Sequence, residues 1–342
     1  MSDDNPAAVH RIGNRKPAAT IYDVAEVVGV SPSTVSRALN KPGRINAKTE
    51  ERIRHAAEAL GYRLNPMARA LLTGKTAMVA LLVSDITNPV FYDIVRGAEN
   101  VATEAGYTLV FAESHQRSDI EFATVERLQP SVDGVLVVAS LLDEDQIAQL
   151  SETKPIVIAL RPVEGIPHVV PNSETGLVQA VDHLQELGHR SIGYLSGPTT
   201  FWANRHRWNI LFEHAVAKGM SIVEIPPDDP VPNGGATRLR RILASGVTAV
   251  VVYNDLMAIG LISECKREGV DVPGRLSIVG FDDVYGANLI SPSLTTIDSS
   301  LGKVGGAAMW CLLAEVDGTT GYEPPELPTR LIVRESTASA PS

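Results

Sequence analysis

The chain has 342 residues, enough for two or three domains, and its 44% hydrophobic content is typical of a globular protein. No apolar run reaches the ~18 residues that a membrane helix needs. Residues 1–19 lack the apolar segment of a secretory signal, so we expect a disordered arm there and a cytoplasmic protein. Two cysteines, Cys265 and Cys311, are too few for a disulfide framework or a metal site, and we expect buried free thiols.

Charge is unevenly distributed along the chain. The net charge of −10 by itself argues against a nucleic-acid partner. However, residues 9–75 carry 12 Lys and Arg against 5 Asp and Glu, whereas the chain from Thr76 onward carries 18 against 33. This distribution predicts a basic N-terminal module that attracts phosphate and an acidic body behind it.

The first predicted elements are two short helices within residues 20–40. Thr20 can cap the first helix, whose apolar positions are followed by Gly29, a residue that ends helices well. Ser31 can cap the second helix, and Pro32 stands at its first position, where a missing N–H costs nothing. Two helices at this spacing indicate a helix-turn-helix, which presents its second helix to the DNA major groove.

The second helix has an apolar side, formed by Val35 and Leu39, and a polar side. The polar side carries short hydrogen-bonding residues and one arginine, Arg37, which can form two hydrogen bonds to a guanine edge. An unrelated helical hairpin with a solvated polar face would show the same spacing. The outward residues, and therefore the first DNA-contact candidates, are Ser33, Thr34, Ser36, Arg37 and Asn40.

A third helix is predicted from Asn46 to Leu60, with Gly61 ending it. Its inner stripe should consist of Ile53, Ala56, Ala57 and Leu60. Its basic residues could contact phosphates or form a solvated face, and the sequence leaves both alternatives open. These basic residues are Lys48, Arg52 and Arg54.

Several motifs in this region occur in a recognisable order. The segments T-I-Y-D-V-A, G-V-S, T-V-S-R-A-L-N and A-L-G-Y closely resemble the headpiece of the lactose/galactose repressor (LacI/GalR) family. The resemblance implies a DNA-binding headpiece over residues 20–63 and a hinge helix or linker over residues 64–76. It implies DNA contacts from Thr20, Tyr22, Ser31, Pro32, Ser33, Thr34, Ser36, Arg37, Asn40, Tyr62, Ala68, Arg69 and Leu71.

The hinge segment reads as a helix of barely two turns, which is marginal by itself in water. In the family that it resembles, this helix folds only on DNA, and a leucine from each of two hinges wedges into the minor groove. Leu71 falls at that position. An ordinary linker, with Leu71 packed on the body, is the alternative. Leu64 stands where the family usually has proline.

From Ala77 the chain alternates buried apolar runs with helical stretches, which predicts an α/β fold with two parallel-sheet lobes. This body resembles the family's effector-binding core, which is similar to periplasmic sugar-binding proteins. The resemblance implies a core over residues 77–336 followed by a tail over 337–342. Lobe 1 should cover about 77–172 and 297–329, and lobe 2 about 173–296 and 330–336.

Ligands of such sheets bind beyond the carboxyl ends of the strands. Polar and aromatic residues follow several predicted strands. They include carboxylates, an amide and an arginine beside an aromatic ring, and this combination suits a polyhydroxylated ligand. Asp85 and Asp255 could equally be strand-end caps, and Ser299 stands where related proteins often carry glutamine. The effector-binding candidates are Asp85, Asn88, Phe91, Trp202, Arg207, Asn254 and Asp282.

No catalytic motif is present in the sequence, and we expect no catalytic residue, cofactor or metal. The interpretation is a ligand-responsive transcriptional regulator, a repressor of sugar or related catabolic genes that binds a pseudo-palindromic operator as a homodimer. The tail lacks a leucine heptad, so no tetramer is expected. The alternatives are a sugar-binding or sugar-processing α/β enzyme and a regulator that responds to a purine or nucleoside.

Overall fold

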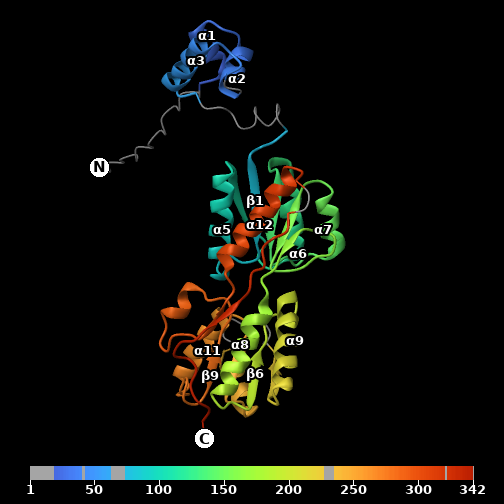
Figure 1. The fold of residues 1–342 in the computed structure, drawn as a ribbon, viewed down its shortest axis with the longest axis vertical. Helices are drawn as coiled ribbons and strands as arrows, with labels where there is room; N and C mark the ends of the chain where they lie inside the picture. The colour runs from blue at the N-terminus through green and yellow to red at the C-terminus, as the bar shows by residue number, and fades with distance from the viewer. Residues whose placement is uncertain (1–18, 41–42, 63–73, 227–234, 320–321, 342) are drawn as a thin grey trace, which may run out of the picture. The chain divides into compact units, whose positions relative to one another are not determined.

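The computed structural model describes residues 19–40, 43–62, 74–226, 235–319 and 322–341. The chain forms two compact units, residues 1–75 and residues 76–342 (Figure 1). The first unit is helical. The second is an α/β core with two lobes.

The N-terminal unit contains three helices, α1 (Ile21–Val28), α2 (Pro32–Asn40) and α3 (Ala47–Leu60). The Thr20 hydroxyl accepts a hydrogen bond from the Asp23 amide, and the Asp23 carboxylate accepts from the Thr20 amide, so α1 begins with a capping box. Gly29 ends α1 and Gly61 ends α3, both in the left-handed conformation that glycine adopts without strain.

The three helices enclose one small apolar core. Its buried members come from all three helices: Val24, Ala25, Val28, Val35, Ala38, Ile53, Ala56 and Ala57. One predicted core position is wrong. Leu60 is the last residue of α3 and is 38% exposed, whereas Ile53, Ala56 and Ala57 of the same helix are buried.

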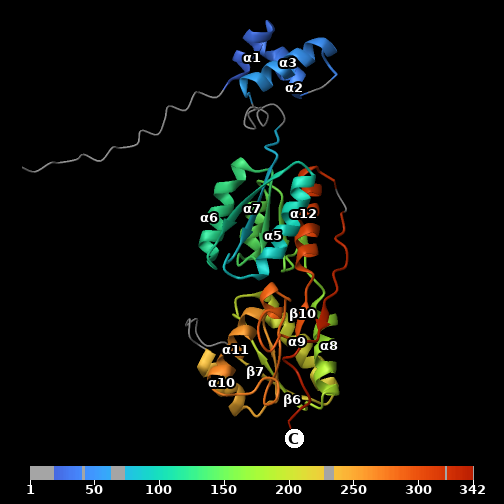
Figure 2. The same cartoon turned by 90° about the vertical axis from the view of Figure 1, so that its left-hand side faces the viewer.

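Lobe 1 is a parallel five-stranded sheet in the order β2-β1-β3-β4-β5, with helices on both faces (Figures 1 and 2). Its strands are β1 (Met78–Val83), β2 (Thr108–Glu113), β3 (Gly134–Val138), β4 (Ile156–Ala159) and β5 (His168–Val169). Alternate residues of β1 face opposite sides. Val79 and Leu81 join the cluster under α5 (Val90–Glu104) and α12 (Leu301–Val316), and Ala80 and Leu82 join the one under α6 (Ser118–Leu128) and α7 (Glu144–Ser151).

Lobe 2 repeats this architecture with a parallel sheet in the order β7-β6-β8-β9. The strands are β6 (Ser191–Leu195), β7 (Ser221–Ile225), β8 (Ala249–Val252) and β9 (Ser277–Val279). Helices α8 (Ser173–Glu186) and α9 (Trp202–Ala217) cover one face, and α10 (Gly235–Ala244) and α11 (Asp255–Arg267) cover the other. All four strands therefore direct their carboxyl ends to the same edge.

Three connections join the lobes, and they lie side by side. Asn172 forms a bridge with Pro328, and β10 (Thr296–Asp298) pairs antiparallel with β11 (Arg330–Ile332). After β10 the chain returns to lobe 1, where α12 packs against α5, as Figure 2 shows. After β11 it remains on lobe 2, where the Ile278 amide donates to the Ser336 carbonyl.

Not every strand of the core is one of the continuous apolar runs from which strands were predicted. Strand β7 lies at the edge of its sheet and is largely exposed, so its sequence lacks the continuous apolar run of a central strand.

Candidate effector site and nucleic-acid interface

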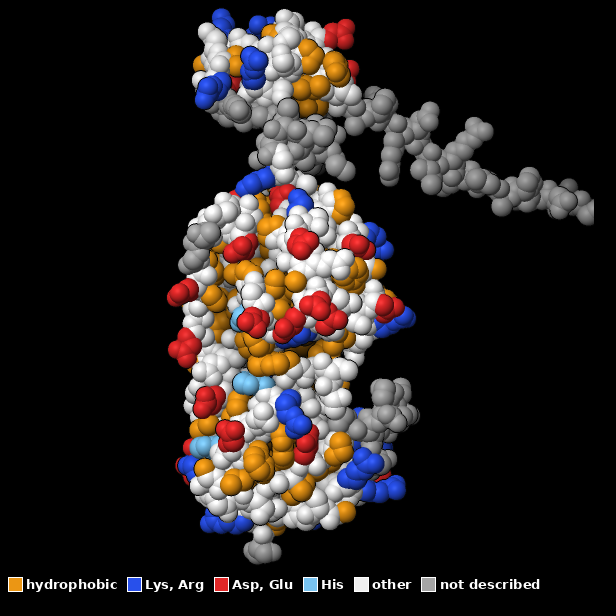
Figure 3. Space-filling view, turned by 90° about the vertical axis from the view of Figure 1, so that its right-hand side faces the viewer, with side chains coloured by type: hydrophobic (Ala, Val, Ile, Leu, Met, Phe, Trp, Pro, Cys, Tyr) orange, Lys and Arg blue, Asp and Glu red, His pale blue; other side chains and the backbone are white. Residues whose placement is uncertain are grey.

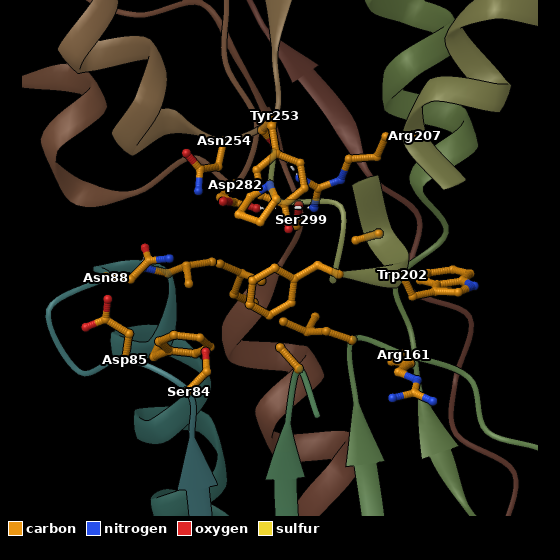
Figure 4. Close-up of a pocket in the computed structure, with 18 of the residues that line it drawn as sticks. Ser84, Asp85, Asn88, Arg161, Trp202, Arg207, Tyr253, Asn254, Asp282 and Ser299 are labelled. Carbon is orange, nitrogen blue, oxygen red and sulfur yellow. Dashed lines mark hydrogen bonds and ion pairs between the residues drawn. The ribbon is translucent and has the colours of Figure 1, made fainter. Parts of the chain in front are cut away.

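A cavity of about 240 Å³ lies between the two lobes, at the carboxyl ends of both sheets. Figure 4 shows labelled side chains from both lobes around it, and Figure 3 shows hydrophobic side chains gathered where the lobes meet. All seven effector-binding candidates line this cavity: Asp85, Asn88, Phe91, Trp202, Arg207, Asn254 and Asp282. Residues separated by almost 200 positions in the sequence therefore meet in one site.

Arg207 is fixed between two aromatic rings. Its guanidinium carbon lies 3.5 Å from the centroid of the Phe281 ring and 5.0 Å from that of Tyr253. One terminal nitrogen donates a hydrogen bond to the Tyr253 carbonyl, and its Nε has no partner among the described residues. Stacking on the two rings holds the guanidinium in one orientation. The group is therefore already positioned to bind a ligand oxygen.

Asp282 faces Arg207, with 3.6 Å between Oδ1 and the nearer guanidinium nitrogen. The carboxylate is only 7% exposed, and burial raises its pKa to about 8, while Arg207 opposes that shift. Its backbone is held at φ 117° by pairing with the connection strand, where the Asp282 amide donates to the Ile297 carbonyl. The strained conformation aims an acceptor into the cavity.

Asn254 and Ser299 complete the polar wall. The Asn254 side-chain oxygen accepts a hydrogen bond from the Met257 amide and so caps α11. Its NH₂ group is the part that can donate a hydrogen bond to a ligand. Ser299 is buried, and its hydroxyl has no hydrogen-bond partner among the described residues. A buried hydroxyl without a partner is costly, so a ligand that reaches it gains more than it would at the surface.

Lobe 1 contributes a polar corner made by a tight turn after β1. The Asp85 carboxylate accepts from the Thr87 amide and hydroxyl and from the Gln116 side chain, at 2.6–2.9 Å. Asn88 accepts from the Val90 amide, at 3.2 Å. Asp85 thus caps its own loop and also lines the cavity, so both alternatives left by the sequence apply to it.

The aromatic candidates lie on opposite lobes. Phe91 lies in the first turn of α5 and is 5% exposed, at the cavity wall. Trp202 begins α9 and stacks on His206, with 4.4 Å between ring centroids. A stacked indole offers its outer face to the C–H side of a sugar or to a base.

Asp255 is a strand-end cap and does not line the cavity. It is fully buried, and it accepts from the Thr296 hydroxyl and the Val284 amide. Burial raises its pKa to about 7. Its neighbour Gly280 has to lack a side chain, because a Cβ there would lie 2.1 Å from the Asp255 carboxylate.

Several cavity residues were not predicted. Tyr253 precedes Asn254, and only its stacking on Arg207 reveals a role. Ser84, Gln116 and Ser140 follow three different strands and are ordinary polar residues in the sequence. The one available signal was their position at strand ends, which many loop residues share.

Most of the described DNA-contact candidates of the headpiece belong to α2 or to its N-terminal cap. Tyr22 is 70% exposed, and Ser33 and Arg37 are also exposed. The Ser31 hydroxyl accepts from the Thr34 amide and lies within hydrogen-bond distance of the Ser33 and Thr34 hydroxyls. Thr20, Pro32, Ser36 and Asn40 belong to the same two helices or their caps, whereas Tyr62 packs against the headpiece core.

The basic residues of α3 differ in their surroundings. Arg52 donates to the Val28 carbonyl at the end of α1, so it stabilises the headpiece itself. Arg54 forms an ion pair with Glu50 one turn away. The hinge candidates Ala68, Arg69 and Leu71 lie outside the described residues.

Other kinds of site are missing from the described part of the chain. No group of three or more His, Cys, Asp and Glu there could hold a metal ion. His183 and His189 lie within hydrogen-bond distance of Thr337 and Ala338 of the C-terminal segment, respectively, and His189 also of Thr248. No helix among the same residues is long and apolar enough to cross a membrane. Cys265 and Cys311 are buried and free.

Together, the basic three-helix unit and the two-lobed α/β core define a class of protein, a DNA-binding regulator that responds to a ligand held between its lobes. Similarity to known proteins supports this assignment. Residues 20–65 match the model described as bacterial regulatory proteins, lacI family, and residues 181–337 match that of the periplasmic binding protein-like domain.

Relatives match over nearly the whole chain. The HTH-type transcriptional repressor CytR of Escherichia coli strain K12 is 31% identical over 336 residues, covering 96% of this chain and 98% of its own. The crystal structure of the Lac repressor dimer bound to operator and the anti-inducer ONPF has a TM-score of 0.83 at 26% identity, covering 94% and 99%. A LacI-family regulator from Enterococcus faecium with bound ribose has a TM-score of 0.68 at 26% identity, covering 77% and 99%.

The chain belongs to the LacI family of bacterial regulatory proteins. It is a DNA-binding transcriptional regulator that responds to a small-molecule effector. The expected α/β fold with a helix-turn-helix headpiece and a core like that of periplasmic binding proteins is confirmed.

Proposed function

We propose that the protein is a cytoplasmic repressor that binds a pseudo-palindromic operator as a homodimer and changes its affinity for DNA when a sugar binds between its lobes. The observation that carries this proposal is the cavity wall formed by Arg207, Asp282, Asn254 and Ser299. It combines a fixed cation, a buried carboxylate, an amide and an unpartnered hydroxyl.

Such a wall suits a polyol because each ligand hydroxyl both donates and accepts. A hydroxyl can accept from the Arg207 guanidinium and donate to Asp282, and an adjacent hydroxyl can pair with Asn254. The ribose bound by the Enterococcus faecium regulator and the operator-bound Lac repressor dimer support a sugar effector and a dimer for this chain as well.

The lobes suggest how a ligand could act. The connections near Asn172, Thr296 and Thr329 are the parts that a change in the angle between the lobes would bend. A ligand that binds one angle more tightly by a few kcal/mol shifts the population toward that angle. In the proposed mechanism this shift alters how two headpieces of a dimer reach their half-sites.

A catalytic function is not proposed. The relatives are transcriptional regulators. The alternative of a sugar-processing enzyme would require turnover of a bound sugar, which product analysis by chromatography would detect.

A thermal-shift screen of D-ribose, D-xylose, D-glucose, cellobiose and adenosine would test the proposal, followed by operator-binding titrations. We expect a sugar to raise the melting temperature and to change DNA affinity. A shift with adenosine alone would favour the nucleoside alternative. No change in DNA affinity with a sugar that binds would contradict a sugar-responsive regulator.

A further inference from the structure

The walls of the cavity contain an unusual number of strained backbone conformations. Eight non-glycine residues of the described chain have positive φ, and seven of them line the cavity or adjoin a residue that does: His115, Gln116, Ala139, Leu160, Asp282, Asp283 and Ser300. Such conformations persist only where surrounding contacts enforce them. Those contacts are therefore part of the site even where they lie behind it.

Two of the strained residues, Ala139 and Leu160, form an apolar floor on lobe 1. They follow the neighbouring strands β3 and β4, with φ of 53° and 67°. Ala139 donates its amide to the Ala159 carbonyl, so the two turns are joined directly. Neither residue type favours this conformation, because a Cβ crowds the backbone there.

A buried glutamate on α6 holds the turn at Ala139. Glu121 is 1% exposed, and one of its oxygens accepts from the Ser140 hydroxyl. Its other oxygen accepts from the Leu141 amide at 3.1 Å. The Ser140 hydroxyl also accepts from the Leu142 amide at 3.2 Å, so one carboxylate fixes three successive residues after Ala139.

Arg161, which belongs to the turn at Leu160, holds the turn at Ala139. A single terminal nitrogen donates to the Ser140 carbonyl at 3.1 Å and to the Leu142 carbonyl at 2.6 Å. Because Arg161 follows Leu160 directly, these bonds tie the strained Leu160 turn to the strained Ala139 turn. In Figure 4 the Arg161 guanidinium points away from the polar wall of Arg207 and Asp282.

We propose that Glu121 and Arg161 are positioning residues of the effector site, which clamp the turns at Ala139 and Leu160 and thereby fix the apolar floor that the effector contacts. The inference rests on the proposed function for the effector, but the clamp itself can be tested without a ligand. Burial raises the pKa of Glu121, so part of its role can be filled by a neutral group of the same shape.

Hydrogen–deuterium exchange of the unliganded full chain tests the clamp. Arg161→Met keeps the apolar stem but removes both bonds to the turn carbonyls. We expect the amides of residues 139–142, 160, 161 and 163 to exchange about tenfold faster or more, with other strands of the sheet unchanged. The exposed Arg127 on α6 provides the control, since Arg127→Met should leave both segments as in the wild type. Unchanged exchange in Arg161→Met would overturn the clamp.

Substitutions of Glu121 separate a positioning role from general stability. Glu121→Gln retains an acceptor and the volume, so we expect exchange and effector affinity within about twofold of the wild type. Glu121→Ala should loosen residues 139–142. If that variant fails to fold, Ser140→Ala supplies the test, because it removes the hydroxyl that joins Glu121 to the turn. Wild-type exchange at residues 139–142 in Ser140→Ala would contradict the proposal.

Effector affinity is the second readout, measured by titration with whichever of the five screened compounds shifts the wild type. We expect Arg161→Met to weaken that binding by roughly tenfold, with operator affinity in the absence of ligand unchanged. Equal affinity in Arg161→Met and wild type would refute the link to the site. If none of the compounds shifts the wild type, the sugar proposal fails, whereas exchange still decides the clamp.

Discussion

The guanidinium carbon of Arg207 lies 3.5 Å from the centroid of the Phe281 ring, and the guanidinium faces the buried carboxyl group of Asp282. Phe281 directly precedes Asp282, so the segment after one strand supplies both the ring under Arg207 and the carboxyl group that faces it. Arg207 comes from α9, more than seventy residues earlier. Because of this pairing the polar wall is already formed before a ligand binds. Less side-chain entropy is therefore lost on binding.

Removing this arginine should abolish the response to the effector. Arg207→Ala deletes charged hydrogen bonds worth about 1.5–3 kcal/mol and leaves Asp282 without its cation. We expect effector affinity to fall by about a hundredfold while operator affinity without ligand stays within twofold. Isothermal titration with the effector and fluorescence anisotropy with operator measure the two quantities.

Arg205 provides the matched control for this experiment. It lies on the same helix and is exposed, and it does not line the cavity. Arg205→Ala should therefore bind effector as the wild type does. An effector response that persists in Arg207→Ala would mean that the site lies elsewhere.

Arg37 should read bases in the operator. It is exposed on α2, where it can form two hydrogen bonds to one guanine. We expect Arg37→Ala to cost about 1–3 kcal/mol on the cognate operator and to relax preference at one base pair. Arg54, which pairs with Glu50, is the comparison, since Arg54→Ala should leave base preference unchanged. Equal losses for Arg37→Ala on cognate and random DNA would indicate a phosphate contact.

Stability of the core should fall as pH rises through neutrality. Burial raises the pKa of Asp282 to about 8 and that of Asp255 to about 7, from 3.8 in each case. Between about pH 4 and pH 8 the folded state therefore holds protons that the unfolded chain has released. Raising the pH across this window favours the unfolded state, because unfolding then releases the proton.

Asp282→Asn should make this pH dependence shallower, because Asp282 then no longer titrates in the window while Asp255 still does. Urea unfolding from pH 4.5 to pH 8 measures the slope. Asp119→Asn is the control, since its hydrogen bond with Arg117 lowers the pKa of Asp119 and moves its titration below the window. A slope that is the same in Asp282→Asn and wild type would show that Asp282 is ionised throughout.

The close packing of α5 on α12 should not tolerate a methyl group added at Gly97 or Gly305. A Cβ at Gly305 would lie 2.0 Å from the Ile94 carbonyl oxygen, and one at Gly97 would lie 1.9 Å from that of Gly302. We expect Gly305→Ala to destabilise the core by about 1–3 kcal/mol, because backbone atoms cannot move aside as a side chain can.

Gly260 offers the matched substitution in another helix of the core. A Cβ there meets nothing within 4 Å, and the residue lies within α11. Gly260→Ala should therefore be neutral or stabilise by about 0.5–1 kcal/mol through reduced backbone entropy. Thermal unfolding of Gly305→Ala and Gly260→Ala measures the difference in stability. Equal melting temperatures of the two variants would argue against the close contact of α5 and α12.

The sequence alone was most informative where structure is local. Caps at Thr20, Ser31 and Asn46 and stops at Gly29 and Gly61 depend on contacts within one turn, and a single sequence records them directly. The same holds for the buried strands, whose apolar runs lie on consecutive residues. The polar residues that follow those runs were accordingly recognised as cavity candidates.

Only the tertiary structure decided which of those polar residues face a ligand and what holds them. Asp255 and Asp282 both follow strands, yet one is fully buried under Thr296 while the other faces Arg207. Glu121 and Arg161 meet at one turn although they lie forty residues apart, and Leu60 is exposed because its helix ends there. Such outcomes depend on how elements pack across the fold, and no pattern of neighbouring residues encodes which distant side chain lies opposite.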